Sequence, residues 1–212
     1  MFFQFYESRN LKNIFLAIVV SIIFCGSINA QADTSIVPLS SIDSTIIQDV
    51  RYATINNFTG KVLYPTSKVF LRKAAAEKLS SANKFLKEKY NYRIKIFDGY
   101  RPLSVQKKLW EIVPDERYVA DPSKGSRHNR GAAVDVTIID STGNELDMGT
   151  GYDDFTEKAH PFYQNISDTA KRNRKLLREI MTSFDFEPFE TEWWHFDFKG
   201  WEKFSIQGFQ IN

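Results

Sequence analysis

The chain has 212 residues, of which 42% are hydrophobic and 25% charged, a composition typical of one globular domain. Its formal net charge is only +2, so no strong field favours binding to nucleic acid or to an anionic membrane. Cys25 is the only cysteine, which excludes an intramolecular disulfide and a cysteine-rich structural zinc site. A metal site with nitrogen ligands must draw on His128, His160 and His195.

The first thirty residues have the pattern of a secretory signal peptide. Arg9 and Lys12 precede an apolar run at 14–24, and Ala30-Gln31-Ala32 is typical of a cleavage site. The run is shorter than the roughly 20 apolar residues of a membrane span, which favours a cleaved signal peptide. The alternatives are an uncleaved membrane anchor and lipid attachment at Cys25. We therefore expect a signal peptide at 1–30, a mature domain at 31–212, export to the periplasm and no stable membrane insertion.

Periodicity predicts helices and strands that are interspersed without a regular βαβ repeat. A short helix or strand is expected within 33–50, and residues 113–131 are expected to form a long functional loop. This pattern favours a single α+β domain with an antiparallel-rich central sheet flanked by helices. The expected helices are 70–89, one that begins at Pro102 and packs Val105, Leu109 and Ile112 against the core, and 167–184 with Ser167 as N-cap; the expected strands are 93–97, 132–139 and 192–198.

Three side chains are candidates to hold a metal ion. Asp135 lies inside the apolar stretch 132–139, where an unpaired charge is costly, so it needs a metal or a cation nearby. The residues alone leave open a metal, or a salt bridge from Asp135 to Arg101 or Arg130. His195 could likewise be a metal ligand or a core histidine, and His128 could be a ligand or a solvated loop residue.

Glu192 stands three residues before His195, which favours the metal interpretation. Two imidazoles and one carboxylate commonly hold a catalytic zinc with one position open to water, and a second carboxylate can take the proton of that water. Residues i and i+3 of a regular strand point to opposite faces. Glu192 must therefore lie where the strand begins, or at a bulge, to reach the metal.

The motif Ser126-x-His128-x-x-Gly131-x-Ala133-x-Asp135, followed by Glu192-x-x-His195, resembles the zinc D,D-peptidases. The fuller likeness, over about residues 45–200, is to the D-alanyl-D-alanine dipeptidases, the group that includes the vancomycin-resistance dipeptidase. The blocks that extend it are Tyr52-Ala53-Thr54, Asn57-Phe58-Thr59-Gly60, Asp98-Gly99-Tyr100-Arg101-Pro102 and Glu192-Trp193-Trp194-His195.

The resemblance implies roles at eight matching positions. Asp153 would lie near the ammonium group of the substrate, with the adjacent Asp154 as the alternative. Arg127 stands where relatives can carry a small polar residue, which leaves substrate preference open. The implied roles are His128, Asp135 and His195 as ligands of one zinc ion, Glu192 as general base, Arg101 as stabiliser of the oxyanion, and Ser126, Tyr52 and Asp153 as contacts of the dipeptide.

The function expected from these residues and this resemblance is an exported zinc dipeptidase that hydrolyses D-alanyl-D-alanine to D-alanine. The first alternative is a D,D-carboxypeptidase or endopeptidase that trims peptidoglycan stem peptides with the same zinc site. The second is a non-catalytic domain that keeps zinc to bind a cell-wall peptide. Tyr52 and Trp194 are candidates to close the pocket against longer chains, and His160 is assigned no chemistry.

Overall fold

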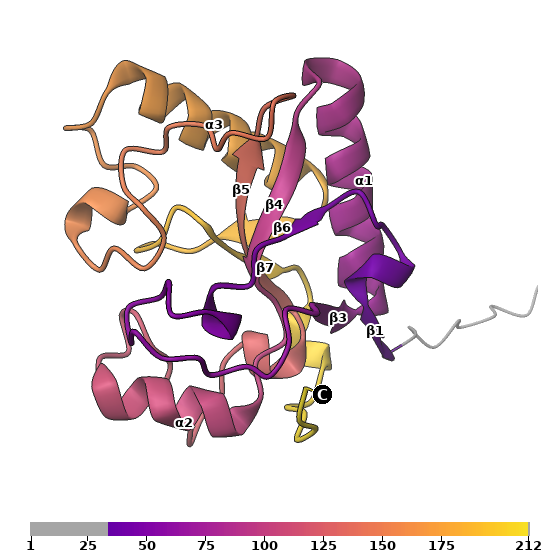
Figure 1. Cartoon of the computed structure of the whole chain (residues 1–212), viewed down its shortest axis with the longest axis vertical. Helices are drawn as coiled ribbons and strands as arrows, with labels where there is room; N and C mark the ends of the chain where they lie inside the picture. Colours follow the sequence, from indigo (N-terminus) through magenta and orange to yellow (C-terminus); the bar gives the residue numbers. More distant parts are fainter. Residues whose placement is uncertain (1–33, 212) are drawn as a thin grey trace, which may run out of the picture. The chain divides into compact units, whose positions relative to one another are not determined.

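A five-stranded sheet forms the centre of the molecule (Figure 1). The computed structural model describes residues 34–211, so the predicted signal peptide at 1–30 lies outside the described residues. β2 runs parallel to β4, whereas the other three neighbouring pairs are antiparallel, as the sequence predicted for most of the sheet. In spatial order the strands are β2 (Ile47–Gln48), β4 (Arg93–Asp98), β5 (Ala133–Ile139), β7 (His195–Phe198) and β6 (Phe186–Pro188).

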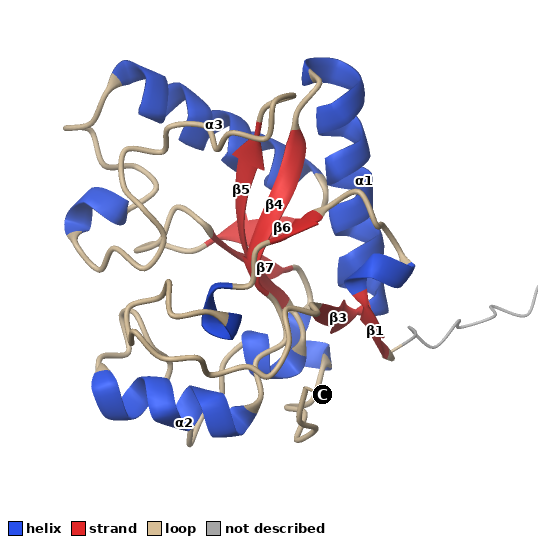
Figure 2. Cartoon of the chain, in the orientation of Figure 1, coloured by secondary structure: helices blue, strands red, loops and turns tan. Residues whose placement is uncertain are grey.

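Two long helices cover one face of this sheet (Figure 2). α1 (Lys73–Tyr90) packs on β4, α3 (Asp168–Ser183) packs on β6, and the two helices contact each other. The shorter α2 (Leu103–Ile112) follows β4 and lies away from that pair (Figure 1). The described residues thus form one α+β domain with an antiparallel-rich sheet flanked by helices, which confirms the predicted fold class.

The two long helices form where the apolar spacing predicted them. In α1 the residues at three- and four-residue steps are fully buried, and Asn91 ends the helix in the left-handed conformation, with φ 57°. At the start of α3, the Ser167 hydroxyl accepts a hydrogen bond from the backbone nitrogen of Ala170 at 3.0 Å, as expected of an N-cap. The buried α1 residues are Ala75, Leu79, Ala82 and Leu86.

The register of the sheet brings three polar residues to one place. β5 is buried along its whole length, and Asp135 at its third position pairs with His195 on β7 and with Asp98 on β4. A shift in register between Ile96 and Asp98 interrupts the β4–β5 ladder just before this point. Adjacent strands are about 4.8 Å apart, so the pairing alone places these polar groups within a few ångströms of one another.

Two local predictions are wrong. Phe70–Arg72 forms the strand β3, paired antiparallel with β1 (Ile36–Pro38), and the helix begins only at Lys73. Leu71 has a spacing that also fits a helix, but backbone bonds of β3 to β1 and to the 99–100 turn hold it extended. Ile112 is 46% exposed instead of packed, because α2 ends there and its last turn faces solvent.

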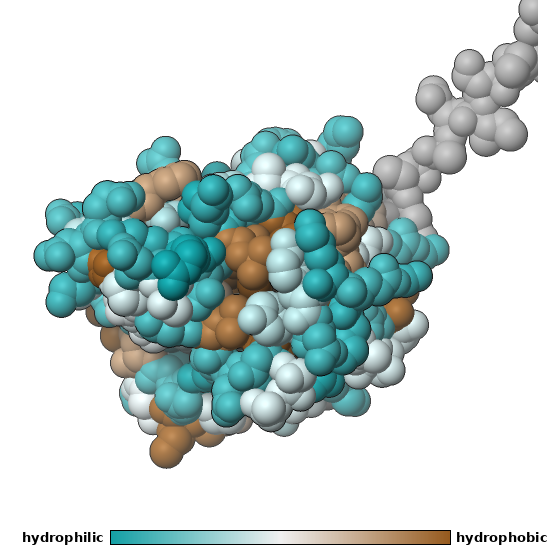
Figure 3. Space-filling model, turned by 90° about the horizontal axis from the view of Figure 1, so that it is seen from above, coloured by the Kyte–Doolittle hydropathy of each residue, from teal (hydrophilic) through white to brown (hydrophobic). Residues whose placement is uncertain are grey.

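The face of the molecule seen in Figure 3 is mainly hydrophilic. Seen from above, hydrophilic residues surround a smaller area of apolar surface (Figure 3). Within residues 34–211 no helix combines the length and the apolar character needed to cross a bilayer.

Candidate active site

Three potential ligand atoms form a compact triangle at the end of the sheet where β4 stops and β7 begins. His128 comes from a 3₁₀ turn at 128–130, Asp135 from β5 and His195 from β7. His128 Nε2 lies 3.2 Å from His195 Nδ1 and 3.4 Å from Asp135 Oδ1. His195 Nδ1 and Asp135 Oδ1 are 3.1 Å apart. All three side chains are nearly fully buried. Segments separated by up to 67 positions therefore converge on one point.

These spacings fit a tetrahedral metal site. Nitrogen and oxygen ligands about 2.0–2.1 Å from zinc, at tetrahedral angles, lie about 3.3–3.4 Å from one another. The three edges of the observed triangle, 3.1, 3.2 and 3.4 Å, are close to that value. The residues thus offer three ligands of one tetrahedron and leave its fourth position to a water molecule or a substrate.

Hydrogen bonds behind the ligands determine which atoms face the metal position. His128 Nδ1 donates to the carbonyl oxygen of Gly99 at 2.7 Å, which leaves Nε2 free to coordinate. His195 Nε2 lies 3.0 Å from Asp197 Oδ1, which leaves Nδ1 free. Such outer contacts fix imidazole orientation and raise ligand basicity. Each imidazole therefore presents one defined nitrogen to the ion.

Two further side chains contact the carboxylates of this site, Tyr152 at Asp135 and Arg127 at Asp197. The Tyr152 hydroxyl donates to Asp135 Oδ2 at 3.0 Å, so that Asp135 Oδ1 points to the other two ligands. Arg127 Nε lies 3.4 Å from Asp197 Oδ2, and its guanidinium stacks over the Trp201 ring at 4.6 Å. Arg127, which the sequence marked as unusual, thus contacts the carboxylate that holds His195.

Several carboxyl groups share this buried site, and burial and their neighbouring charges shift their pKa values. Burial, and then the charges of Asp135 and Asp153, raise the pKa of Glu192 to about 8. Burial by itself lowers the pKa of His195, but the charge of Asp197 and the bonds to Asp135 and Asp197 raise it to about 10. The pKa of Asp135 is lowered, because both imidazoles outweigh the effect of burial. A surplus of buried negative charge favours a cation at this position.

Glu192 lies in the turn just before β7, where the metal hypothesis requires it. The backbone nitrogen of His195 reaches the carbonyl oxygen of Glu192 at 3.4 Å, and this turn brings the carboxylate round to the face of His195. Glu192 Oε2 is 3.7 Å from His195 Nδ1, and the side chain is buried. The predicted strand at 192–198 therefore begins three residues later, at His195.

Arg101 reaches the same pocket from the turn after β4. Its guanidinium donates to Asp98 Oδ2 at 2.9 and 2.8 Å and to Gln106 Oε1 at 3.1 Å, and Nη2 is 3.8 Å from Asp135 Oδ2. The Tyr64 hydroxyl holds the other oxygen of Asp98 at 2.9 Å. Pairing with Asp98 thus orients Arg101, which still lines the pocket.

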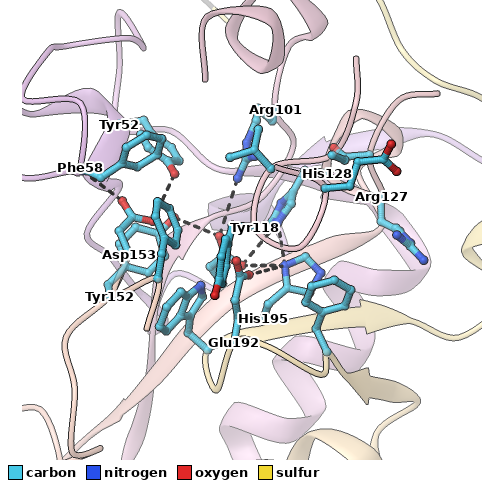
Figure 4. Close-up of a pocket in the computed structure, with 18 residues that line it drawn as sticks. Tyr52, Phe58, Arg101, Tyr118, Arg127, His128, Tyr152, Asp153, Glu192 and His195 are labelled. Carbon is cyan, nitrogen blue, oxygen red and sulfur yellow. Dashed lines mark hydrogen bonds and ion pairs between the residues drawn. The ribbon is translucent and has the colours of Figure 1, made fainter. Parts of the chain in front are cut away.

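The three residues expected to contact a dipeptide line the same pocket (Figure 4). Asp153 accepts from the Tyr52 hydroxyl and from the backbone nitrogen of Phe58, both at 3.3 Å. Burial, and then the charge of Asp135, raise the pKa of Asp153 to about 7. Asp154 instead accepts bonds from Thr156 and lies outside the described residues that line the pocket. Ser126 is buried there beside His128.

Sequence reasoning missed several residues around the pocket. Asp197 could have been found, because it shares a strand face with His195 two positions away. Tyr152, and the rings of Tyr118 and Phe155, come from loops with no periodic signal, whereas Phe58 lies in a quoted family block but was given no role. Trp194, one of the rings expected to close the pocket, does line it.

Comparison with known proteins identifies the family. The model of the family described as D-ala-D-ala dipeptidase matches residues 32–205. This chain belongs to that family. It is therefore a peptidase of a metal-dependent family, and His128, Asp135 and His195 form its possible metal site.

The relatives are similar over most of their length. A D-alanyl-D-alanine dipeptidase of Escherichia coli (strain K12) is 38% identical over 164 residues, which cover 77% of this chain and 84% of the relative. Those of Enterococcus faecalis and Enterococcus faecium are 31% and 32% identical over 169 residues, which cover 70% of this chain and 83% of each relative. A solved LD-carboxypeptidase, LdcB, aligns with a TM-score of 0.42 at 22% identity, over 63% of this chain and 61% of that one.

Proposed function

We propose that this chain is an exported zinc dipeptidase that hydrolyses D-alanyl-D-alanine to D-alanine. The relatives that carry this name support the substrate. The observation that carries the mechanism is the triangle of ligand atoms on His128, Asp135 and His195, with edges of 3.1–3.4 Å. The leader pattern at 1–30 supports export to the periplasm of a mature domain at 31–212.

The donor set favours one zinc ion for each chain. Two imidazole nitrogens and one carboxylate oxygen are the ligands of several catalytic zinc sites. When bound, zinc polarises a carbonyl group and lowers the pKa of a coordinated water to about 7. Glu192 would be ionised more readily beside a bound cation, because burial by itself opposes its charged form.

Glu192 and Arg101 perform the chemistry of this chain. The Glu192 carboxylate accepts the proton of the attacking water and then donates it to the leaving amine, for which its position 3.7 Å from a ligand atom is suitable. Arg101 is always charged and is held in place by Asp98, so it stabilises the negative charge that develops on the carbonyl oxygen.

The remaining pocket residues hold the dipeptide. Asp153 pairs with the free ammonium group, and the Tyr52 hydroxyl orients the carboxylate of Asp153. Ser126 contributes a polar contact near His128. An ammonium group is the natural partner for a buried carboxylate whose charge is otherwise unpaired.

Replacement of the base tests this proposal. We expect Glu192→Gln to lower kcat for D-alanyl-D-alanine by about a hundredfold or more, because the amide cannot accept the proton of water. Zinc content, measured by elemental analysis, should stay at one ion for each chain. The matched control is Glu190→Gln, an exposed residue two positions away, which should keep the activity of the unchanged enzyme. Unchanged turnover in Glu192→Gln would remove this residue from the mechanism.

Substrate comparison separates the alternatives. The unchanged enzyme should cleave D-alanyl-D-alanine and should leave the L,L isomer and a longer stem peptide intact. Rapid cleavage of the stem peptide without cleavage of the dipeptide would indicate a D,D-carboxypeptidase. Tight zinc binding without hydrolysis of either substrate would indicate a binding domain.

A further inference from the structure

Three aromatic rings from three different loops pack together over the pocket. The Phe155 ring stands in the middle, with its centroid 5.0 Å from that of Phe58 and 5.0 Å from that of Tyr118. All three rings line the pocket and all three are partly exposed. We name Phe58, Phe155 and Tyr118 the aromatic clasp. Each edge or tilted pair of rings adds stability beyond its burial, so the clasp connects three loops that are far apart in the sequence.

Phe58 and Phe155, two of the three rings of the clasp, lie at the end of the pocket that contains Asp153. The backbone nitrogen of Phe58 donates to Asp153 Oδ2 at 3.3 Å, and Phe155 follows Asp153 by two residues. Tyr52, which bonds to the other oxygen of Asp153, also contacts the Phe58 ring, with centroids 6.3 Å apart. Figure 4 shows Tyr52, Phe58 and Asp153 on one side of the pocket and the two histidines on the other.

We propose that the aromatic clasp sets the length of the substrate, by closing the pocket directly beyond the position of the substrate's ammonium group. This inference rests on the proposed function, in which Asp153 pairs with that group. A dipeptide ends at Asp153. A peptide with one more residue on the amino side must place that residue where Phe58 and Phe155 pack against each other. Such a peptide also brings an amide to Asp153 in place of the ammonium, so charge and shape act together.

Removal of the central ring tests the clasp. We expect Phe155→Ala to raise the ratio of kcat/KM for D-alanyl-D-alanyl-D-alanine to kcat/KM for D-alanyl-D-alanine by about tenfold or more. The gain should come mainly from a lower KM for the tripeptide, because the ring obstructs binding and does not touch the reacting atoms. A merely structural role for Phe155 would lower the activity on both substrates and leave the ratio unchanged.

Two further variants keep this test decisive. Phe162→Ala is the matched control, because Phe162 is 62% exposed and stacks with Arg178 outside the pocket lining; it should leave the ratio unchanged. Tyr118→Ala opens the other end of the clasp and should raise the ratio as well, and it replaces Phe155→Ala if that variant does not fold. A folded Phe155→Ala or Tyr118→Ala enzyme with the ratio of the unchanged protein would overturn the proposal.

The same measurements keep the two proposals apart. An unchanged enzyme that does not cleave the dipeptide overturns the proposed function by itself. The clasp is judged by the comparison between variant and unchanged enzyme. A dipeptide-cleaving enzyme whose ratio is not altered by loss of the Phe155 ring overturns only the inference about the clasp.

Discussion

Asp153 is a residue that the proposed function needs but that lowers the stability of the folded protein. Its side chain is partly buried, and desolvation, followed by the charge of Asp135, holds its pKa at about 7, well above the ordinary value of 3.8. The folded protein therefore binds a proton that the unfolded chain has already lost between about pH 4 and pH 7. Stability falls as pH rises through this window and stays lower above it.

We expect Asp153→Asn to stabilise the protein, because the amide avoids the buried charge. The gain in thermal unfolding temperature over the unchanged protein should be small near pH 4, should grow up to about pH 7 and should then stay constant. Differential scanning calorimetry without added zinc measures it. Asp154→Asn is the comparison, because its carboxylate faces Thr156 and not the pocket. A gain that does not depend on pH would contradict the argument, and the same variant should lose affinity for the dipeptide.

At the scale of elements, the turn at 98–101 contacts both a proposed metal ligand, His128, and the proposed oxyanion stabiliser, Arg101. Asp98 holds Arg101, and the carbonyl oxygen of Gly99 accepts from His128 Nδ1 at 2.7 Å. A Cβ atom on Gly99 would lie 2.7 Å from Val69 Cγ1 and 3.1 Å from the carbonyl oxygen of Phe70. Glycine is thus required here by the close approach of β3, whatever its backbone angles.

We expect Gly99→Ala to destabilise the protein by about 1–3 kcal/mol, because the added methyl group forces the turn away from β3. The displaced carbonyl should also weaken the hold on His128 and lower zinc affinity. Urea unfolding and chelator competition measure the two effects. Gly208→Ala is the control, since a Cβ atom there meets no atom within 4 Å. Equal zinc affinity in Gly99→Ala and the unchanged protein would show that the turn does not position His128.

Elements were predictable in proportion to their length. α1 and α3 have 18 and 16 residues, enough for a helical period to stand out. β1, β3 and β6 have three residues each and β2 has two, too few for any alternation to be recognised. Phe70–Arg72 continues the helical spacing of the sequence for this reason, and only its tertiary contacts with β1 and with the 99–100 turn hold it extended.

At the scale of the whole molecule, the segment 206–211 returns to the loops of the site. The backbone nitrogen of Gln207 donates to the carbonyl oxygen of Asn129, next to His128, at 2.9 Å. The Tyr100 hydroxyl donates to the carbonyl oxygen of Phe209 at 2.8 Å, and the two rings stack with centroids 4.2 Å apart. This segment therefore supports the residues that precede Arg101 and follow His128.

We expect a protein that ends at Ser205 to unfold at a lower temperature and to bind zinc more weakly. The lost stacking and hydrogen bonds amount to about 1–3 kcal/mol, and the turn that carries His128 loses its support. Thermal unfolding and chelator competition measure both. Phe209→Ala should reproduce part of the loss, whereas Phe162→Ala should not. A truncated protein with full stability and full zinc affinity would show that residues 206–212 have no such role.

The amino-acid sequence was enough to predict the family of this protein and to propose its chemistry, namely which residues could bind a metal and which acid would act beside them. It could do so because the reaction needs particular side chains, and their spacing survives as a motif. The alignment of Asp98, Asp135 and His195 across three strands, and the meeting of the rings in the aromatic clasp, could be seen only in the folded protein. Those contacts join residues far apart in the chain, and local periodicity carries no information about such pairs.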